Sequence, residues 1–367
     1  MTDALTIPFA AAEAKAPAKR IPVAVLGATG SVGQRFVQLL DGHPWFKLHE
    51  IVASERSAGK SYGEAAEWRL DTMLPSDAAA LPVKQLGADL DSRLVFSGLD
   101  SSVAGEAEDD YANRGSVVVS NSRNHRMDAD VPLLIPEINA DHIAAIERQK
   151  KRRRGYIVTN PNCSVIGLAM AIAPIERLYG IESIHVTTMQ AISGAGYAGV
   201  ASYAILDNVI PYIGGGEEQK IESEPRKILG SWENDRFVDA PFRVSAQVNR
   251  VPTIDGHLMT ISIGLRNRNS VNLDQVREAI DNFRGEPQSL RLPSAPRKPL
   301  HYVAGEDRPQ PRLDRDRERG MSVSIGRLRP CPLLDLRMVA LVHNTIRGAA
   351  GAAILNAELL EAKGMLA

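Results

Sequence analysis

One of the two cysteines of this 367-residue chain, Cys163, follows Asn-Pro-Asn and precedes a long apolar run in the segment VTNPNCSVIG. Asparagine and proline favour a tight loop, so the pattern predicts a loop that presents Cys163 at the first turn of a helix. The dipole of a helix lowers the pKa of a thiol at this position and raises the thiolate fraction. We therefore expect Cys163 to be a nucleophile, whereas Cys331, between two prolines, is interpreted as structural.

A nucleophilic thiol needs a proton partner, which is normally a histidine that is distant in sequence and close in space. Among the eight histidines, His257 follows Gly256 at the head of an alternating apolar stretch. A side chain there can project from the end of a strand into a cleft. A buried structural histidine is the alternative interpretation of this residue. The other histidines lack a comparable setting, although His125 lies in a basic loop.

A glycine-rich segment near the N-terminus, VLGATGSVGQ, predicts a dinucleotide site. It follows a short apolar run typical of a buried strand and opens a helical pattern. Glycines at this junction let the backbone approach a pyrophosphate, which the helix N-terminus stabilises. The residues that we expect to contact the cofactor here are Gly27, Thr29, Gly30, Ser31, Val32 and Gly33.

The segment after the next predicted strand, VASERSAGKS, bears on the choice between NAD and NADP. Ser54, Arg56 and Ser57 are suited to hold a ribose 2′-phosphate, whereas Glu55 is suited to accept from a free ribose hydroxyl. The sequence favours NADP(H).

The elements that must position these residues form two patterns. Between 21 and 158, short apolar runs alternate with helical segments, which predicts an α/β domain with a Rossmann-type doubly wound parallel sheet. From 159 to 337, alternating stretches such as FRVSAQVNRVP and LMTISIGLR predict an α+β domain with a mixed sheet. A small-residue C-terminal helix, 338–365, is expected to return to the first domain. Residues 1–20 are expected to form a disordered tail, and 308–320 an extended arm or interface loop.

Composition restricts the class of protein. With 44% hydrophobic residues, 24% charged residues and a net charge of −1, the chain resembles an ordinary globular enzyme, and no nucleic-acid partner is expected. No apolar run approaches the roughly 20 residues that cross a bilayer, so no membrane partner is expected. The first twenty residues lack the apolar block of a secretory signal, and two cysteines cannot form a disulfide framework. We expect a cytoplasmic protein.

Several motifs together carry a family resemblance. GATGSVGQ, NSRNHRMD, TNPNCS, TMQAISGAG, GGEEQKIESEPRKILG and NRVPTIDGH resemble the aspartate-β-semialdehyde dehydrogenase family, and QPRLDRDRERGM with GRLR resembles its archaeal and fungal branch. The similarity runs from about Ile21 to the C-terminus. It implies NADPH-dependent reductive dephosphorylation of L-aspartyl 4-phosphate to L-aspartate 4-semialdehyde through a Cys163 thioester, in the biosynthesis of lysine, threonine, methionine and isoleucine.

The resemblance also implies how the chain assembles and what it binds. The second domain would be a catalytic and dimerisation domain, and the chain a homodimer or homotetramer. The substrate would be a small molecule, with inorganic phosphate as co-substrate and no metal.

The family's site residues carry over position by position. Cys163 matches the nucleophile, His257 the acid/base and Gln190 the glutamine that orients the substrate. Arg250 matches the arginine that binds the α-carboxylate, and Glu217 the acid that holds the ammonium, with Glu218 as the alternative one position on. The phosphate pocket matches Lys220, Arg126 and Asn162, and the nicotinamide contacts match Ser193, Gly194 and Asn344.

Three other functions remain open at this point. An N-acetyl-γ-glutamyl-phosphate reductase and a malonyl-CoA-type acyl-CoA reductase share a Cys/His pair on a similar plan, and they differ in the acyl and leaving-group pockets. The Glu217/Arg250 pair suits a free amino acid and favours the first interpretation. A catalytically dead NADP-binding protein is the non-enzymatic alternative. Such a chain would not need to keep together Cys163, Gln190, Arg250 and His257.

Overall fold

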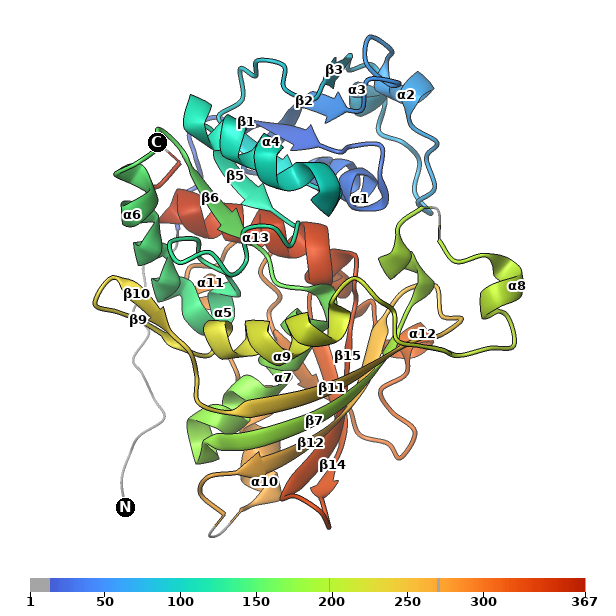
Figure 1. Cartoon of the computed structure of the whole chain (residues 1–367), viewed down its shortest axis with the longest axis vertical. Coiled ribbons are helices and arrows are strands. Elements are labelled where there is room, and N and C mark those ends of the chain that lie inside the picture. Colours follow the sequence, from blue (N-terminus) through green and yellow to red (C-terminus); the bar gives the residue numbers. More distant parts are fainter. Residues whose placement is uncertain (1–13, 198, 269–270, 367) are drawn as a thin grey trace.

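The computed structural model describes residues 14–197, 199–268 and 271–366. Within these residues the chain builds a six-stranded and a seven-stranded sheet, with a small hairpin beside them. Helices lie between the two large sheets (Figure 1). Most of the predicted tail, residues 1–13, lies outside the described residues. Ala14, where the description begins, donates its N–H to the carbonyl oxygen of Leu290 at 3.0 Å.

The first sheet confirms the predicted doubly wound parallel arrangement. Its strand order is β3-β2-β1-β4-β5-β6, and every neighbouring pair is parallel. The strands are short, apolar and rich in valine, because both faces of a parallel sheet are covered. Their bounds are β1 Ile21–Leu26, β2 Phe46–Ala53, β3 Val83–Gln85, β4 Leu94–Ser97, β5 Val117–Ser120 and β6 Tyr156–Thr159.

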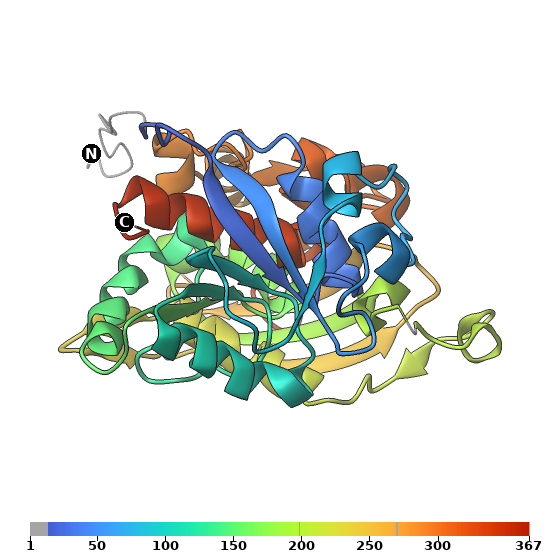
Figure 2. The same ribbon diagram turned by 90° about the horizontal axis from the view of Figure 1, so that it is seen from above.

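Helices cover both faces of this sheet. Helix α1 (Ser31–Leu40) and the C-terminal helix α13 (Gly351–Ala362) pack on one face, and α4 (Ser101–Arg114) packs on the other. Seen from above, α13 in red and α4 in teal lie on opposite sides of the strands (Figure 2). The C-terminal helix α13 thus packs on the sheet of the first domain.

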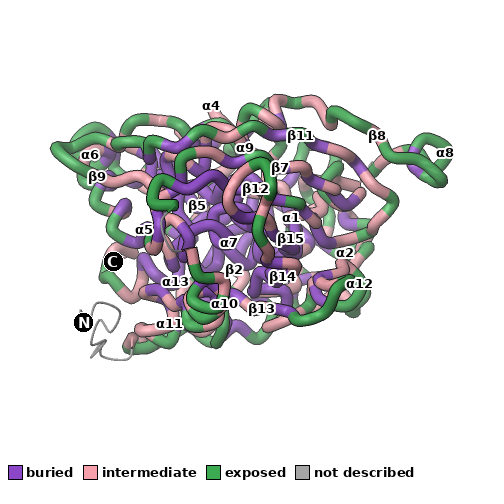
Figure 3. The backbone as a smooth tube through the Cα atoms, turned by 90° about the horizontal axis from the view of Figure 1, so that it is seen from below, coloured by how far each residue is buried: buried purple, intermediate pink, exposed green. Residues whose placement is uncertain are grey.

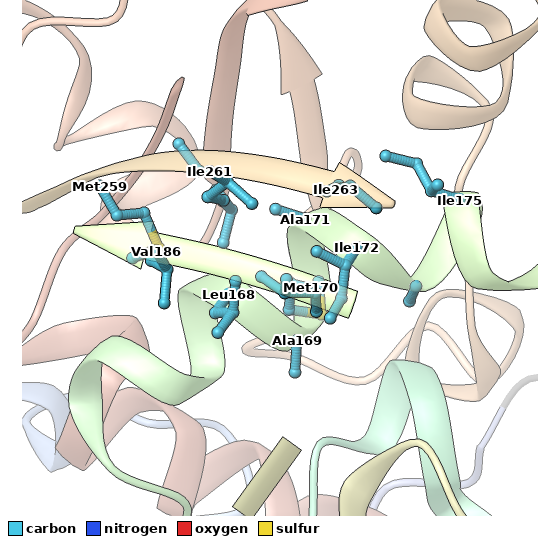
Figure 4. Close-up of a cluster of buried hydrophobic side chains, with 14 of the residues drawn as sticks. Leu168, Ala169, Met170, Ala171, Ile172, Ile175, Val186, Met259, Ile261 and Ile263 are labelled. Atoms are coloured by element: carbon cyan, nitrogen blue, oxygen red, sulfur yellow. The ribbon is translucent and has the colours of Figure 1, made fainter. Parts of the chain in front are cut away.

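The second sheet is mixed, as predicted. Its order is β13-β14-β15-β12-β7-β11-β8, with parallel pairs β13/β14 and β7/β11 and antiparallel pairs elsewhere. One face packs on the apolar helix α7 (Cys163–Tyr179), from which Leu168 and Ile172 meet Val186 and Ile261 (Figure 4). The strands are β7 Ile181–Gln190, β8 Ile210–Pro211, β11 Arg243–Arg250, β12 His257–Leu265, β13 Leu300–Tyr302, β14 Val323–Pro330 and β15 Leu336–Val342.

Two local predictions were wrong. Residues 338–342 belong to strand β15, because their alternating side chains complete the ladder between β12 and β14; the helical segment begins only at Ile346 with a π-helical turn. Residues 308–320 are folded, so the extended arm, the first of the two alternatives given for them, is not found. The buried carboxylate of Asp314 accepts from the guanidinium groups of Arg308 and Arg317, and this contact winds the segment into helix α12 (Pro311–Asp314) and a 3₁₀ turn.

Of the remaining elements, α9 packs against α7 and β11 between the two layers (Figure 1), and most of the others are short. The tube coloured by burial shows α7, α13 and β5 in the interior, with exposed positions on α8, α10 and α12 (Figure 3). None of the described helices combines the length and apolar character needed to span a bilayer. These elements are α2 Tyr62–Ala65, α3 Ser76–Ala79, α5 Pro136–Asn139, α6 Ile146–Lys150, α8 Ser202–Ile205, α9 Glu217–Ile228, α10 Leu273–Asp281, α11 Glu286–Ser289, and the hairpin β9 Ser231–Glu233 with β10 Arg236–Val238.

A buried ion pair fastens the C-terminal segment to the fold. The Arg347 guanidinium donates to both carboxylate oxygens of Glu137 at 2.8 and 2.7 Å, and both side chains are fully buried. We expect Arg347→Met to lower the free energy of unfolding by about 3–5 kcal/mol, because it leaves the Glu137 carboxylate buried without its partner. Urea unfolding followed by circular dichroism measures this change.

The matched control is a bidentate pair on the surface. Arg152 donates to both oxygens of Asp130 at 2.8 and 3.0 Å, but its side chain is half exposed. Arg152→Met should cost about 1 kcal/mol or less, because water replaces the lost contact. Equal losses in the two variants would contradict the role given to burial.

Candidate active site

Several residues that the sequence predicts to be functional lie together at one end of the strands of the second sheet. Strands β7 and β11 are parallel and end side by side at Gln190 and Arg250, while the antiparallel strand β12 begins at His257. On the other side of the same space, β6 ends at Thr159 and the chain enters α7 at Cys163. A cavity of about 320 Å³ opens here, and both layers contribute to its lining.

The loop before the nucleophile is held by asparagine side chains. Asn162 is the N-cap of α7, and its side-chain oxygen accepts from the backbone N–H groups of Ser164 and Val165 at 2.9 and 3.3 Å. Asn160 donates to the carbonyl of Ala349 at 3.0 Å and accepts from Asn356 at 2.7 Å. These contacts explain why the Asn-Pro-Asn motif precedes Cys163, since they fix Cys163 as the first residue of the helix.

The thiol environment differs from the prediction. Burial raises the pKa of Cys163 to about 12, and the negative charge of Glu217 adds to this shift, while Arg126, Arg250 and Lys220 oppose it. The expected lowering of the pKa by the helix dipole is therefore wrong for the free protein, because removal of water from the sulfur outweighs the nearby positive charges. The resting side chain is a thiol.

His257 lies directly behind the sulfur. Its Nε2 is 3.2 Å from Sγ of Cys163, and its Nδ1 accepts the backbone N–H of Ala191 at 3.0 Å. Because Nδ1 is an acceptor, the neutral ring carries its proton on Nε2, facing the sulfur. Burial, reinforced by the charge of Arg250, lowers the pKa of His257 to about 3. At neutral pH the ring is therefore an uncharged hydrogen-bond donor.

Charged groups line the cavity beside the sulfur. Glu217 accepts from Nδ2 of Asn162 at 2.8 Å, from Nε2 of Gln190 at 3.2 Å and from Nζ of Lys220 at 3.1 Å. Arg250 donates one N–H to the carbonyl of Ala191 at 2.6 Å. The cavity thus places the carboxylate of Glu217 and several cationic donors beside one thiol, and a second carboxylate, that of Asp100, also lines it.

The choice between the two neighbouring glutamates follows from their direction. Glu217 belongs to the cavity wall, whereas Glu218 turns away and accepts the backbone N–H of Val248 at 3.2 Å. The structure thus brings Glu217, and not Glu218, together with Cys163.

The glycine loop has the shape that a dinucleotide needs. Gly27 has a φ of +70°, and an added Cβ on it would lie 2.8 Å from the carbonyl oxygen of Gly98. A Cβ on Gly33 would lie 2.2 Å from the carbonyl oxygen of Gly27, so the turn and the first helical turn pack too closely for a side chain. Gly30 provides no side-chain cap to α1, which leaves the first N–H groups of the helix open to an anion. The residues present therefore fit a pyrophosphate.

The other expected cofactor residues fall into two places. Ser193, Gly194 and Asn344 line the cavity together with Ser31 and Val32. Asn344 donates to Oγ of Ser193 at 2.7 Å and accepts the N–H of Gly256 at 2.8 Å, which joins three segments around the opening. The structure does not bring Ser54, Arg56 and Ser57 into this cavity; they form a turn just after β2, at the carboxyl end of the first sheet.

Further residues of the site were missed from the sequence. Arg126 lines the cavity, and its guanidinium pairs with Glu224, which lies seven positions after Glu217 on α9. This spacing places both glutamates on one helix face and was the signal available in the sequence. The cavity lining also includes the following residues that sequence reasoning did not name: Leu99, Asp100, Ser101, Asn121, Ser122, Arg123, Ile213, Thr345, Gly348 and Ala349.

Comparisons with known proteins agree with this geometry. Residues 22–146 match the model "Semialdehyde dehydrogenase, NAD binding domain", and residues 172–347 match "Semialdehyde dehydrogenase, dimerisation domain". The chain is 49% identical over 346 residues to the aspartate-semialdehyde dehydrogenase of Methanothermobacter thermautotrophicus, covering 93% of this chain and 99% of the relative. It is 46% identical over 359 residues to that of Candida albicans, covering 93% and 98%.

Solved structures give the same result. The crystal structure of aspartate-semialdehyde dehydrogenase with NADP from Candida albicans is 43% identical with a TM-score of 0.88, covering 95% of this chain and all of the other. An aspartate-semialdehyde dehydrogenase II of Vibrio cholerae is 26% identical with a TM-score of 0.74, covering 94% and 99%. The chain belongs to the aspartate-semialdehyde dehydrogenase family.

Proposed function

We propose that this chain catalyses the NADPH-dependent reductive dephosphorylation of L-aspartyl 4-phosphate to L-aspartate 4-semialdehyde, with inorganic phosphate as co-substrate of the reverse reaction. The observation that carries the proposal is that Cys163, which contacts His257 through its sulfur, lines one cavity with Glu217, Arg250 and Arg126. A carboxylate suits the substrate ammonium, and a guanidinium suits its α-carboxylate. Arg126 and Lys220 suit the phosphate. Relatives of this name align over nine-tenths of the chain.

In the first step, Sγ of Cys163 attacks the acyl carbon and the bond to the phosphate oxygen breaks. The thiol proton leaves with the phosphate as hydrogen phosphate, so the acylation needs no separate base, which agrees with the raised pKa of Cys163. Arg126 and Lys220 stabilise the charge on the departing phosphate. The product on the protein is a thioester.

In the second step, bound NADPH supplies the hydride that reduces the thioester carbon. His257 then acts through Nε2–H: its Nε2 lies 3.2 Å from Sγ, so a carbon bound to that sulfur would bring its charged oxygen close to this donor. In this role the neutral ring donates a hydrogen bond and keeps its proton, which is the donor part of the acid/base role expected from the sequence. When the carbon–sulfur bond breaks, the aldehyde leaves, and Sγ regains a proton from water. Gln190, hydrogen-bonded to Glu217, orients the substrate in the pocket.

Arg250 is the group proposed to hold the α-carboxylate. One of its N–H groups is fixed by the carbonyl of Ala191, so the guanidinium has a set orientation. Arg250→Lys should raise KM for L-aspartate semialdehyde about tenfold with a smaller change in kcat, because lysine cannot make two parallel hydrogen bonds. Steady-state kinetics at saturating phosphate and NADP measure the change in KM and the change in kcat separately.

The control for this variant lies on the same strand. Arg243 begins β11, and its side chain is largely exposed. Arg243→Lys should leave all kinetic constants unchanged. An Arg250→Lys protein with the wild-type KM would contradict the assignment.

The test of the proposed function is NADPH formation by the purified protein with L-aspartate semialdehyde and NADP, with and without phosphate. Phosphate-dependent turnover is expected. Turnover only when coenzyme A replaces phosphate would make the protein an acyl-CoA reductase. Turnover only with N-acetylglutamate semialdehyde would make it an acyl-glutamyl-phosphate reductase. NADP binding without turnover of any aldehyde would indicate the non-enzymatic alternative.

We further propose a cytoplasmic homodimer or homotetramer. Residues 21–158 with the C-terminal helix form the NADP-binding domain in this proposal, and residues 159–337 form the catalytic and dimerisation domain. The match of residues 172–347 to a dimerisation-domain model supports assembly. The interface proposed is the face of the second sheet away from α7, where side chains such as His185, Gln247 and Thr260 are exposed. Sedimentation equilibrium distinguishes two chains from four, and a monomer would contradict both.

A further inference from the structure

Glu224 is a buried carboxylate on α9 whose two oxygens join separate parts of the site. Its side chain is 2% exposed. Oε1 accepts from Nη1 of Arg126 at 3.0 Å, and Oε2 accepts from the backbone N–H of Asn162 at 2.7 Å. We propose that Glu224 is a positioning residue that fixes the phosphate-binding guanidinium of Arg126 relative to the loop that presents the nucleophile. This inference rests on the proposed function.

Arg126 is held in a defined orientation by two anchors. In addition to Glu224, the carbonyl oxygen of Asn121 accepts from its Nη2 at 2.9 Å. A guanidinium has five N–H donors, so these two contacts leave others for phosphate oxygens in the cavity that Arg126 lines. Glu224 itself lies outside the residues that line the cavity and therefore acts through Arg126.

The same helix face also holds the backbone of the Arg126 loop. Lys227, three positions after Glu224, is buried, and its Nζ donates to the carbonyl oxygens of Arg126, Asp128 and Val131 at 2.8, 2.9 and 2.9 Å. Helix α9 thus sets the guanidinium through Glu224 and the main chain through Lys227. Glu217, at the start of this helix, lies in the cavity, so one rigid element positions the groups proposed for the ammonium and for the phosphate.

The position of Asn162 makes the link to the nucleophile direct. Its backbone N–H is held by Glu224, and its side chain caps the helix that begins at Cys163. A carboxylate is the only side chain of this size that accepts from both donors at once. The isosteric amide of glutamine has one acceptor oxygen, so its NH₂ group would face either Arg126 or the N–H of Asn162.

The test is the variant Glu224→Gln, assayed for NADPH formation with inorganic phosphate varied at saturating L-aspartate semialdehyde and NADP. We expect kcat/KM for phosphate to fall about 10- to 100-fold, the range for losing hydrogen bonds to a charged group, mainly through KM. KM for NADP should stay unchanged, since the glycine loop is not part of this network. A loss spread equally over all substrates would show a merely structural role and overturn the proposal.

A matched control lies two positions away on the same helix. Glu222 accepts the backbone N–H of Ala246 at 3.1 Å, outside the cavity lining. Glu222→Gln should keep the wild-type KM for phosphate.

A double-mutant cycle shows whether Glu224 acts through Arg126. In the Arg126→Gln background, Glu224→Gln should cost much less in kcat/KM for phosphate than it does alone, because contacting residues are not additive. Fully additive losses would overturn the proposal. If Glu224→Gln does not fold, Glu224→Asp takes its place; it keeps the charge but is one methylene too short to reach both donors. A wild-type phosphate KM in Glu224→Asp would overturn the proposal.

The assay of the wild-type protein distinguishes a failure of the proposed function from a failure of the positioning role of Glu224. Absence of phosphate-dependent turnover in the wild type would contradict the proposed function. Normal wild-type turnover together with an unaltered phosphate KM in Glu224→Gln would contradict the positioning role alone.

Discussion

Replacing Cys163 with alanine is expected to abolish phosphate-dependent NADPH formation from L-aspartate semialdehyde, with a loss of about 10⁴-fold or more, because no other group takes over as nucleophile. The sulfur is the atom that Nε2 of His257 faces at 3.2 Å. NADP binding, measured by fluorescence titration, should persist, because the glycine loop is separate from the thiol.

Cys331→Ala is the control for this prediction. Cys331 follows strand β14, and its sulfur accepts the backbone N–H of Leu334, away from the cavity lining. This variant should keep wild-type turnover. A loss of turnover in Cys163→Ala smaller than about 10⁴-fold would contradict the thioester mechanism.

A single-turnover measurement tests the same step from another side. Without phosphate, the wild-type protein mixed with aldehyde and NADP should form about one NADPH per site and stop at the thioester. The mass of the intact protein should then rise by one aspartyl group on Cys163. Neither signal should occur in Cys163→Ala, and a burst in that variant would exclude Cys163 as the acylated residue.

Removing the imidazole of His257 is expected to have the second largest effect. His257→Ala should lower kcat about 10²- to 10⁴-fold, the range for loss of a positioned acid or of an oxyanion donor. His257→Gln should recover part of this loss, because an amide N–H can replace the Nε2–H donor. The reason is the tautomer: Nδ1 accepts from Ala191, so the neutral ring donates from Nε2.

The pH dependence of kcat provides an independent check. The pKa of His257 is lowered to about 3, so the ring becomes protonated only as the pH falls toward that value. Between pH 5 and 8 it stays neutral, and the wild-type profile should show no acid limb at the ordinary histidine pKa of about 6.5. A limb near that value, together with a His257→Gln protein as inactive as His257→Ala, would indicate that Nε2 accepts a proton instead.

The elements near Cys163 could be predicted because their causes are local. The start of α7 at Cys163, directly after the N-cap Asn162, depends on neighbouring residues, and the valine-rich runs that form β1 and β5 depend on their own side chains. Strand β15 was missed because a short apolar run next to a helix fits the pattern of a strand and also that of a buried helix. Only its place between β12 and β14 decides the assignment.

The sequence by itself determined the two-layer α/β plan, the glycine turn before α1 and a cysteine at a helix start, since propensity, periodicity and capping act over a few residues. It identified His257 mainly through the resemblance. The tertiary structure alone decided that Glu217 rather than Glu218 lines the cavity, that Glu224 holds Arg126, and that burial raises the pKa of Cys163. These properties depend on desolvation and on contacts between segments up to about a hundred residues apart, such as Arg126 with Glu224, and no local pattern encodes such contacts.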